Sequence, residues 1–185
     1  EDIHTSTAAR VFNININEVN EEQRRNAKIV NCGIIYGVSA FGLSNQTNLT
    51  RGESKEIIDN YFKSYPKLKE YMSNQISYAR ENGYVETILK RKRYLPEINS
   101  RNAILRSSAE RNAINTPVQG SAADIIKLAM IKIDSEIEKK SLKSKLILQV
   151  HDELVFDVHL PELNIVKEIV SYNMENAIQI DVPLK

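Results

Sequence analysis

Several features are scarce in this sequence, and each scarcity narrows the class of protein. The single cysteine, Cys32, cannot form a disulfide within the chain, which fits a reducing compartment. The 25 basic and 24 acidic side chains leave a net charge of +1, so no strong overall field indicates a nucleic-acid partner. No apolar run approaches the length of a membrane span, and we expect no membrane partner. Any functional signal must therefore come from local clusters of residues.

The remaining composition is that of an ordinary soluble globular protein, with 42% hydrophobic and 26% charged residues. A length of 185 residues suffices for one compact domain or two coupled subdomains. There are no internal repeats or low-complexity linkers. Both ends of the sequence are abrupt, so we expect this chain to work as part of a longer polypeptide, with the rest of that polypeptide as a partner.

Helical spacing of apolar residues dominates the first half of the chain. Gly37 and Gly83 are typical helix ends, and Pro66 is typical of a helix start. A polar loop with at most one short helix joins the second helix to the third. The segments predicted to be helical are 2–12, 21–36, 54–65 and 66–82.

The second half mixes helices with short strands. Residues 84–98 predict two short strands around a basic turn, and residues 145–158 alternate as a β-hairpin does. A long helical stretch, 102–140, contains Pro117, which should disrupt it. An amphipathic helix over 161–178 and a strand from 179 complete the pattern. We therefore predict an α+β fold, with a mainly helical first part and a small antiparallel sheet packed by helices in the second.

One helix carries an unusual surface. In "RRNAKIVNCGIIYG", residues 24–37, the side chains of Arg24, Lys28, Cys32 and Tyr36 recur at steps of four. Because a four-residue step drifts only about 40° around a helix, they form one slanted stripe. Two cations could hold a polyphosphate, and the ring could stack on a base. Taken alone, the stripe also fits a solvated basic face with a tyrosine tucked against a neighbour.

A second cluster lies at the tip of the predicted hairpin, where two hydrophobic strands flank His151, Asp152 and Glu153. Leu146, Leu148 and Val150 are expected to share one face of the incoming strand, and the residues at 154, 156 and 158 one face of the outgoing strand. Rigid strands could hold a carboxylate in place for a hard divalent cation. On its own the pattern also fits a plain polar turn.

Further polar side chains lie in the long helical stretch and in the basic turn. Arg111 and Asn115 are one helical step apart, and Gln119 follows after Pro117. Such side chains reach phosphates, sugars and base edges, but they also occur as hydrogen-bonded residues at a helix kink. The basic turn, residues 90–93, could contact a phosphate backbone or could be an ordinary charged surface.

Taken together and in this order, these motifs resemble the family A DNA polymerases. The resemblance covers essentially all 185 residues, and "RRNAKIVNCGIIYG" and "QVHDELVFDV" are similar to two of the family's signature motifs. The other stretches that carry it are "DIHTSTA", "YFKSYPKLKEYM", "GYVETILKRKRYLPEI" and "AERNAINTPVQGSAADIIKLAM". The resemblance implies that residues 1–83 belong to the fingers and residues 84–185 to the palm.

The resemblance also implies a role for each matching residue in binding the deoxynucleotide (dNTP). Arg24 and Lys28 match cations that hold the triphosphate, and Lys28 is the better candidate to neutralise or protonate the leaving pyrophosphate. Tyr36 matches a ring that guards the template-base position, and His4 matches a histidine near the phosphates. Cys32 stands where the family usually has Phe or Tyr near the sugar, so the usual packing role there is in doubt.

Other matches concern the metal and the primer–template DNA. Asp152 matches a metal-binding aspartate of the palm, and Glu153 supports the site beside it. The residues that match contacts to the primer terminus, the minor groove or the DNA backbone are Arg93, Arg111, Asn115, Gln119 and His151.

The implied chemistry is nucleotidyl transfer from a dNTP to a primer 3′-hydroxyl, with two Mg²⁺ ions at the phosphates. The family's other metal-binding aspartate lies in a motif upstream of "DIHTSTA", so we expect the 185-residue chain to be inactive by itself. Its setting would be the cytoplasm, at the bacterial nucleoid, or a DNA-containing organelle. Two alternatives stay open: a phage-type single-subunit RNA polymerase and a non-catalytic nucleic-acid-binding module.

Overall fold

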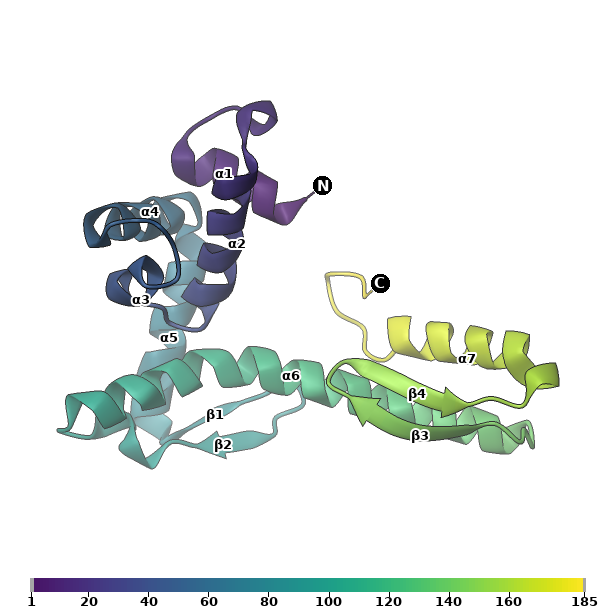
Figure 1. The fold of residues 1–185 in the computed structure, drawn as a ribbon. Coiled ribbons are helices and arrows are strands. Elements are labelled where there is room, and N and C mark those ends of the chain that lie inside the picture. The colour runs from purple at the N-terminus through teal and green to yellow at the C-terminus, as the bar shows by residue number, and fades with distance from the viewer. Residues whose placement is uncertain (1, 185) are drawn as a thin grey trace. The chain divides into compact units, whose positions relative to one another are not determined.

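The structure, a computed structural model, describes residues 2–184 and is built mainly of helices (Figure 1). The α-helices are α1 (Ile3–Phe12), α2 (Glu21–Ile35), α3 (Ala40–Ser44), α4 (Arg51–Ser64), α5 (Pro66–Asn82), α6 (Ala103–Lys139) and α7 (Leu163–Glu175). The strands are β1 (Tyr84–Glu86), β2 (Lys92–Tyr94), β3 (Lys145–Val150) and β4 (Glu153–Asp157). Short 3₁₀ turns are η1 (Ile16–Glu18), η2 (Pro96–Asn99) and η3 (Leu160–Glu162). Helices with small antiparallel hairpins confirm the predicted α+β class.

The chain divides into two compact units. The first unit comprises residues 1–86 and 92–117, and the second comprises residues 87–91 and 118–185. The division between these units does not fall at residue 83, because the β1–β2 hairpin and the first part of α6 pack with the helices that precede them. The assignment of fingers and palm to these residues stays a prediction.

Four helices enclose the main core of the first unit. Asn20 and Thr50 begin α2 and α4 with reciprocal side-chain caps, which satisfy free backbone donors at the helix starts. The apolar faces of these helices meet those of α1 and α3, and burial of such faces is the main driving force for the packing. The buried core residues are Val11, Val30, Ile34, Leu43, Ile57 and Tyr61.

A smaller core in the same unit supports the first hairpin. Strands β1 and β2 pair antiparallel, with Tyr84 opposite Tyr94. Gly83 ends α5 in a left-handed conformation (φ 77°), which turns the chain directly into β1. The buried residues under the hairpin come from α5, β1, the η2 region and α6: Ala79, Val85, Leu95, Ile98, Ala109 and Ala113.

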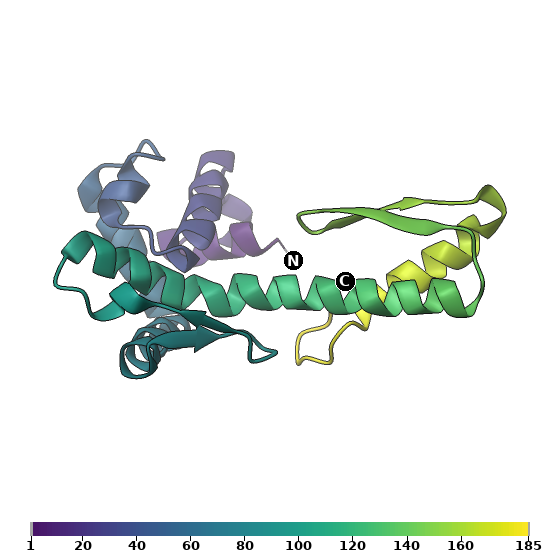
Figure 2. The same cartoon turned by 90° about the horizontal axis from the view of Figure 1, so that it is seen from below.

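In the second unit, the β3–β4 hairpin and α7 flank the C-terminal part of α6 (Figure 2). Ile133 of α6 and Ile169 of α7 are buried together, with Phe156 of β4 packed against them. Glu162 fixes the entry to the hairpin, because its carboxylate accepts hydrogen bonds from the Lys143 and Ser144 amides at 3.0 Å. These hydrogen bonds lower the pKa of Glu162.

The expected break at Pro117 is wrong, because α6 continues through it from Ala103 to Lys139. A proline inside a helix removes one backbone donor and costs about 3 kcal/mol. Apolar residues on both sides offset this cost: Ala113 is buried in the first unit and Ala129 in the second. The division between the two units nevertheless falls at Pro117.

The expected single face of β3 is also wrong. Leu146 pairs with Phe156, but Leu148 pairs with Val155, so Ile147 is an extra residue in a β-bulge. One extra residue reverses which side of the sheet the following side chains face. Leu148 is consequently 54% exposed. The prediction for β4 is confirmed at Leu154 and Phe156, which both pack on the core.

A strand from residue 179 does not form in the part of the chain that the structure describes. Residues 176–184 make turns and bends instead. A strand needs a neighbour for its backbone hydrogen bonds, and the described sheet of this unit pairs only β3 with β4. Over the same described range, no helix is long and apolar enough to cross a membrane.

Candidate functional site

The predicted stripe exists on the surface of α2. Glu21 and Glu22 lie in the first turn of this helix, where negative side chains interact favourably with its dipole. Tyr36 is the residue directly after α2 and is 49% exposed. All four side chains of the stripe are exposed: Arg24, Lys28, Cys32 and Tyr36. The stripe is therefore available to a ligand and is not part of the core.

Three of the stripe residues, Lys28, Cys32 and Tyr36, line one open groove of about 720 Å³. Residues of α3 and of the first part of α6 also line it. The remaining lining residues are Ile29, Gly33, Gly37, Val38, Ser39, Gly42, Gln46, Ser107 and Arg111. The groove thus combines cations, a thiol, an aromatic ring and three glycines within the first unit.

The end of α2 is shaped by Gly37, which has a φ of 71°. A Cβ atom at this position would lie 2.8 Å from Cγ of Arg111. The predicted DNA-binding residue Arg111 therefore packs directly against the turn that follows Tyr36. Its guanidinium also donates to Ser107 Oγ at 3.3 Å.

Arg24 is held by Asp2, the residue that caps α1. The Arg24 Nε donates to Asp2 Oδ2 at 2.6 Å, and Asp2 also accepts from the backbone amides of His4 and Thr5. The hydrogen bond from Arg24 holds the pKa of Asp2 well below its ordinary value. The Arg24 side chain is 48% exposed, so part of its guanidinium faces solvent.

His4 lies on the first turn of α1 and is tied to α2 through Asn31. The Asn31 amide nitrogen lies 3.1 Å from His4 Nδ1 and donates to Thr7 Oγ1 at 3.1 Å. Thr7 is buried, so this contact lies at the base of the α1–α2 interface. The structure thereby brings the predicted phosphate-binding histidine to the helix that carries the stripe.

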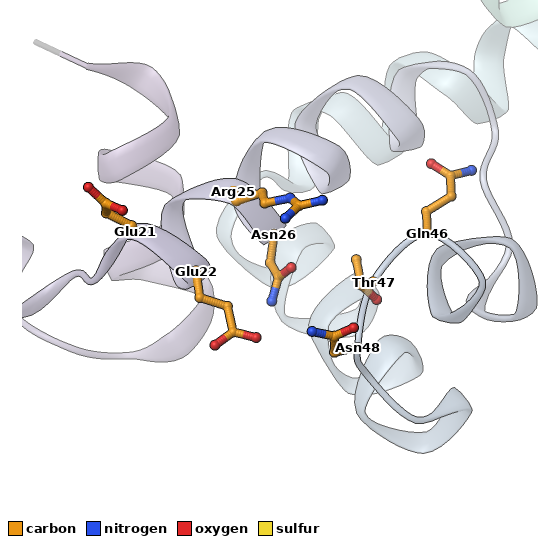
Figure 3. Close-up of a pocket in the computed structure, with 7 residues that line it drawn as sticks. All are labelled: Glu21, Glu22, Arg25, Asn26, Gln46, Thr47 and Asn48. Carbon is orange, nitrogen blue, oxygen red and sulfur yellow. The ribbon is translucent and has the colours of Figure 1, made fainter.

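Arg25, although adjacent to Arg24, lies in a different groove. This groove is polar, has a volume of about 520 Å³ and is formed by the start of α2 and the loop after α3 (Figure 3). The residues that line it are Glu21, Glu22, Arg25, Asn26, Gln46, Thr47 and Asn48. The two arginines of the motif therefore lie on different surfaces of α2.

Among the other predicted DNA-binding residues, Arg93 is exposed on β2 and its guanidinium donates to Thr116 Oγ1 at 3.1 Å. Asn115 lies one turn after Arg111 on α6, and its buried Oδ1 has no hydrogen-bond partner among the described residues. Gln119 is exposed on α6 in the second unit. Arg93 and Asn115 lie within the first unit.

The second predicted cluster forms the tip of the β3–β4 hairpin. Val150 pairs with Glu153, which leaves His151 and Asp152 as a two-residue turn. His151 has a φ of 54°, and Gln149 Nε2 donates to its carbonyl oxygen at 2.8 Å. His151, Asp152 and Glu153 are all exposed. The tip is thus a fixed turn that presents two adjacent carboxylates.

Asp152 also lines a mostly apolar pocket of about 410 Å³ within the second unit. Ser171 and Glu175 of α7 contribute the other polar side chains. Within residues 2–184, no three His, Cys, Asp or Glu side chains are grouped closely enough to hold a metal ion. Asp152 and Glu153 nevertheless fit Mg²⁺ as donors, because this ion binds through one or two carboxylates together with water and phosphate oxygens.

Three residues that lie beside predicted site residues could not be identified from sequence patterns. The sequence pattern predicts Asp2 only as the first residue of a helix, which gives no sign of its contact with Arg24. Asn31 carries a weak signal, since asparagine is unfavourable inside a helix. Glu175 carries none, because its proximity to Asp152 arises only from the packing of α7.

Comparison with known proteins gives a consistent result over the whole chain. The model of DNA polymerase family A matches residues 1–185. The chain is 52% identical to DNA polymerase I of Caldicellulosiruptor bescii, over 99% of this chain and 22% of that protein. It is 50% identical to DNA polymerase I of Bacillus subtilis, over 100% of this chain and 21% of that protein. The chain thus spans about a fifth of the length of these relatives.

A solved structure is similar in both sequence and fold. It is the polymerase domain of Pol1 from M. smegmatis in complex with DNA primer-template and dNTP. The match has a TM-score of 0.92 and 44% identity, and it covers 100% of this chain and 33% of that one. With a family model that matches from the first residue to the last, the chain belongs to DNA polymerase family A.

Proposed function

We propose that this chain supplies nucleotide-binding and metal-binding residues of a DNA-directed DNA polymerase. The observation that carries the proposal is the α2 stripe, whose cation, thiol and ring line one open groove. A dNTP has an anionic triphosphate at one end and a flat base at the other, and the stripe offers cations and an aromatic ring in that order. Membership of family A supports the same substrate.

In this proposal the cations act on the triphosphate. Arg24, oriented by Asp2, and His4, held by Asn31, donate to phosphate oxygens. Lys28 neutralises the charge that develops on the pyrophosphate when the bond between the α-phosphorus and its bridging oxygen breaks. The primer 3′-oxygen forms the new bond to that phosphorus as its proton passes to solvent water. Tyr36 closes the base end of the groove, beside Cys32.

The hairpin tip would hold Mg²⁺ through the Asp152 carboxylate, with Glu153 as a supporting residue. When bound, Mg²⁺ supplies charge stabilisation at the phosphate oxygens and lowers the pKa of the attacking hydroxyl. The fixed turn keeps Asp152 in place without help from the ion. The proposed contacts to primer–template DNA are the exposed side chains of Arg93, Arg111, Gln119 and His151 and the partly exposed side chain of Asn115.

Templated single-turnover incorporation by the complete polymerase tests this function. Lys28→Ala should slow the incorporation of the complementary dNTP by on the order of 10²-fold, because one charge contact in a water-excluded site is lost. Lys55→Ala is the matched control, since Lys55 is an exposed lysine on α4 outside the groove. A rate for Lys28→Ala within about threefold of wild type would place Lys28 on a solvated face, as this is under about 1 kcal/mol.

The same assay separates the alternatives. A DNA polymerase should prefer dNTPs to ribonucleotides on a DNA template. Efficient ribonucleotide incorporation would indicate an RNA polymerase. Binding of primer–template without any incorporation would indicate a binding module.

A further inference from the structure

We infer that Asn31 is a positioning residue that orients His4 to donate a hydrogen bond to the nucleotide phosphates, an inference that rests on the proposed function. Its basis is one side-chain amide that bridges two helices. Asn31 lies on α2, one turn after Lys28, and reaches both His4 and Thr7 of α1. Residues three apart on a helix are surface neighbours, so Asn31 adjoins the stripe.

The chemistry of the contact fixes which ring nitrogen carries the proton. The Asn31 amide nitrogen can only donate, and it lies 3.1 Å from His4 Nδ1. His4 Nδ1 must therefore accept, which places the proton of the neutral ring on Nε2. A protonated Nε2 is a donor, which is the role that a phosphate oxygen requires of its partner.

The second amide hydrogen gives Asn31 a separate contact with α1. It is donated to Thr7 Oγ1 at 3.1 Å, and Thr7 is only 1% exposed. The amide thus contacts a buried hydroxyl and, separately, a partly exposed ring. An asparagine that served only to join α1 to α2 would need the Thr7 contact alone.

The first turn of α1 therefore faces the stripe with two residues. Asp2 accepts from Arg24, and His4 is held by Asn31. In the first pair, a residue at the start of α1 holds a cation of the stripe. In the second pair, a residue of α2 holds a histidine of α1. Only the second pair selects the tautomer of a neutral ring.

The test is a double-mutant cycle between Asn31→Ala and His4→Ala in the complete polymerase. The measured quantity is the equilibrium Kd of the complementary dNTP on a primer–template with a dideoxy-terminated primer, which requires no chemistry. Asn31→Ala should raise this Kd about three- to tenfold, which is the range expected for one hydrogen bond. In the His4→Ala background, Asn31→Ala should change the Kd by less than about twofold, because its effect acts through His4.

Thr7→Val is the structural control, since it removes the other α1 contact of Asn31 but leaves the His4 contact. It should lower the melting temperature and change the Kd less than Asn31→Ala does. Independent effects of Asn31→Ala and His4→Ala that multiply in the double variant would overturn the inference. An increase in Kd with Thr7→Val equal to that with Asn31→Ala would do the same.

The outcome for the wild type separates this inference from the proposed function. A wild-type enzyme that binds and incorporates the dNTP, combined with independent effects, overturns only the role of Asn31. The wild-type enzyme could instead bind the dNTP, with the expected coupling between Asn31→Ala and His4→Ala, but incorporate nothing. That result overturns only the polymerase activity. A wild-type enzyme with no affinity for the dNTP overturns both.

Discussion

At the scale of single residues, the position of Cys32 on α2 decides whether its thiol can react without disturbing the core. Cys32 occupies the middle of the stripe and lines the same groove as Lys28 and Tyr36. It is exposed, whereas Val30 and Ile34 on the other side of α2 are buried. A reagent that adds bulk to the thiol would therefore fill the groove without disturbing the core.

This exposure gives a prediction for the complete polymerase. Alkylation with N-ethylmaleimide should slow incorporation, because the added group occupies space that we assign to the nucleotide. A saturating complementary dNTP should protect the enzyme from the reagent. The measurement is the fraction of activity that survives treatment, compared with Cys32→Ser enzyme, whose fraction should not fall. If peptide mass spectrometry finds Cys32 fully modified while incorporation is unchanged, the groove does not hold the nucleotide.

At the scale of elements, the turn after α2 is under a tighter constraint than the turn after α5. Gly37 and Gly83 both end helices with positive φ, at 71° and 77°. A Cβ atom on Gly37 would contact Arg111, whereas nothing lies within 4 Å of the same position on Gly83. The two turns thus share a left-handed backbone conformation, and they differ in whether a neighbouring side chain packs against the glycine.

Alanine at each position should separate these two contributions. Gly83→Ala should cost roughly 1–2 kcal/mol of unfolding free energy, because of the left-handed conformation alone. Gly37→Ala should cost more, because Arg111 must also move. Adding Arg111→Ala to Gly37→Ala should recover the part of the unfolding free energy that is lost to the Arg111 contact. It should not recover the part lost to the left-handed conformation. Denaturant unfolding of these three variants and of the wild type provides the comparison. Equal costs for the two glycine variants would mean that Arg111 does not press on the turn.

Local sequence signals explain which elements could be predicted. Asn20 and Gly37 bracket α2, and turn residues at 151 and 152 mark the second hairpin, so these elements followed from the chain itself. The bulge at Ile147 and the continuity of α6 through Pro117 depend on packing against distant residues. The stripe could be predicted because its residues share one helix. The Asn31–His4 pair could not, since it joins residues 27 positions apart.

At the scale of the whole molecule, the proposed functions are distributed over two compact units. The groove proposed to bind the nucleotide lies within the first unit and the carboxylate tip within the second. Each site is held by its own core, so each can be tested separately. A change at the tip should leave dNTP affinity at the groove largely intact if the assignment is right, and it should act on metal-dependent chemistry.

The most direct test of the account is therefore the metal dependence of incorporation at the hairpin tip. The complete polymerase should be compared with its Asp152→Asn, Glu153→Gln and Asp157→Asn variants across a Mg²⁺ titration. Asp157 is the matched control, because it is an exposed carboxylate at the far end of β4. Thermal melting and duplex affinity at fixed salt show whether each variant is folded and binds DNA.

The account predicts that Asp152→Asn lowers the maximal incorporation rate by about two orders of magnitude or more, with folding and duplex binding retained. Loss of a metal ligand removes several kcal/mol of charge stabilisation, and each 1.36 kcal/mol is a factor of ten in rate. Glu153→Gln should be milder, at about 10- to 100-fold, and Asp157→Asn should be neutral. Near-normal incorporation by Asp152→Asn, or a loss that only follows a loss of fold, would contradict the account.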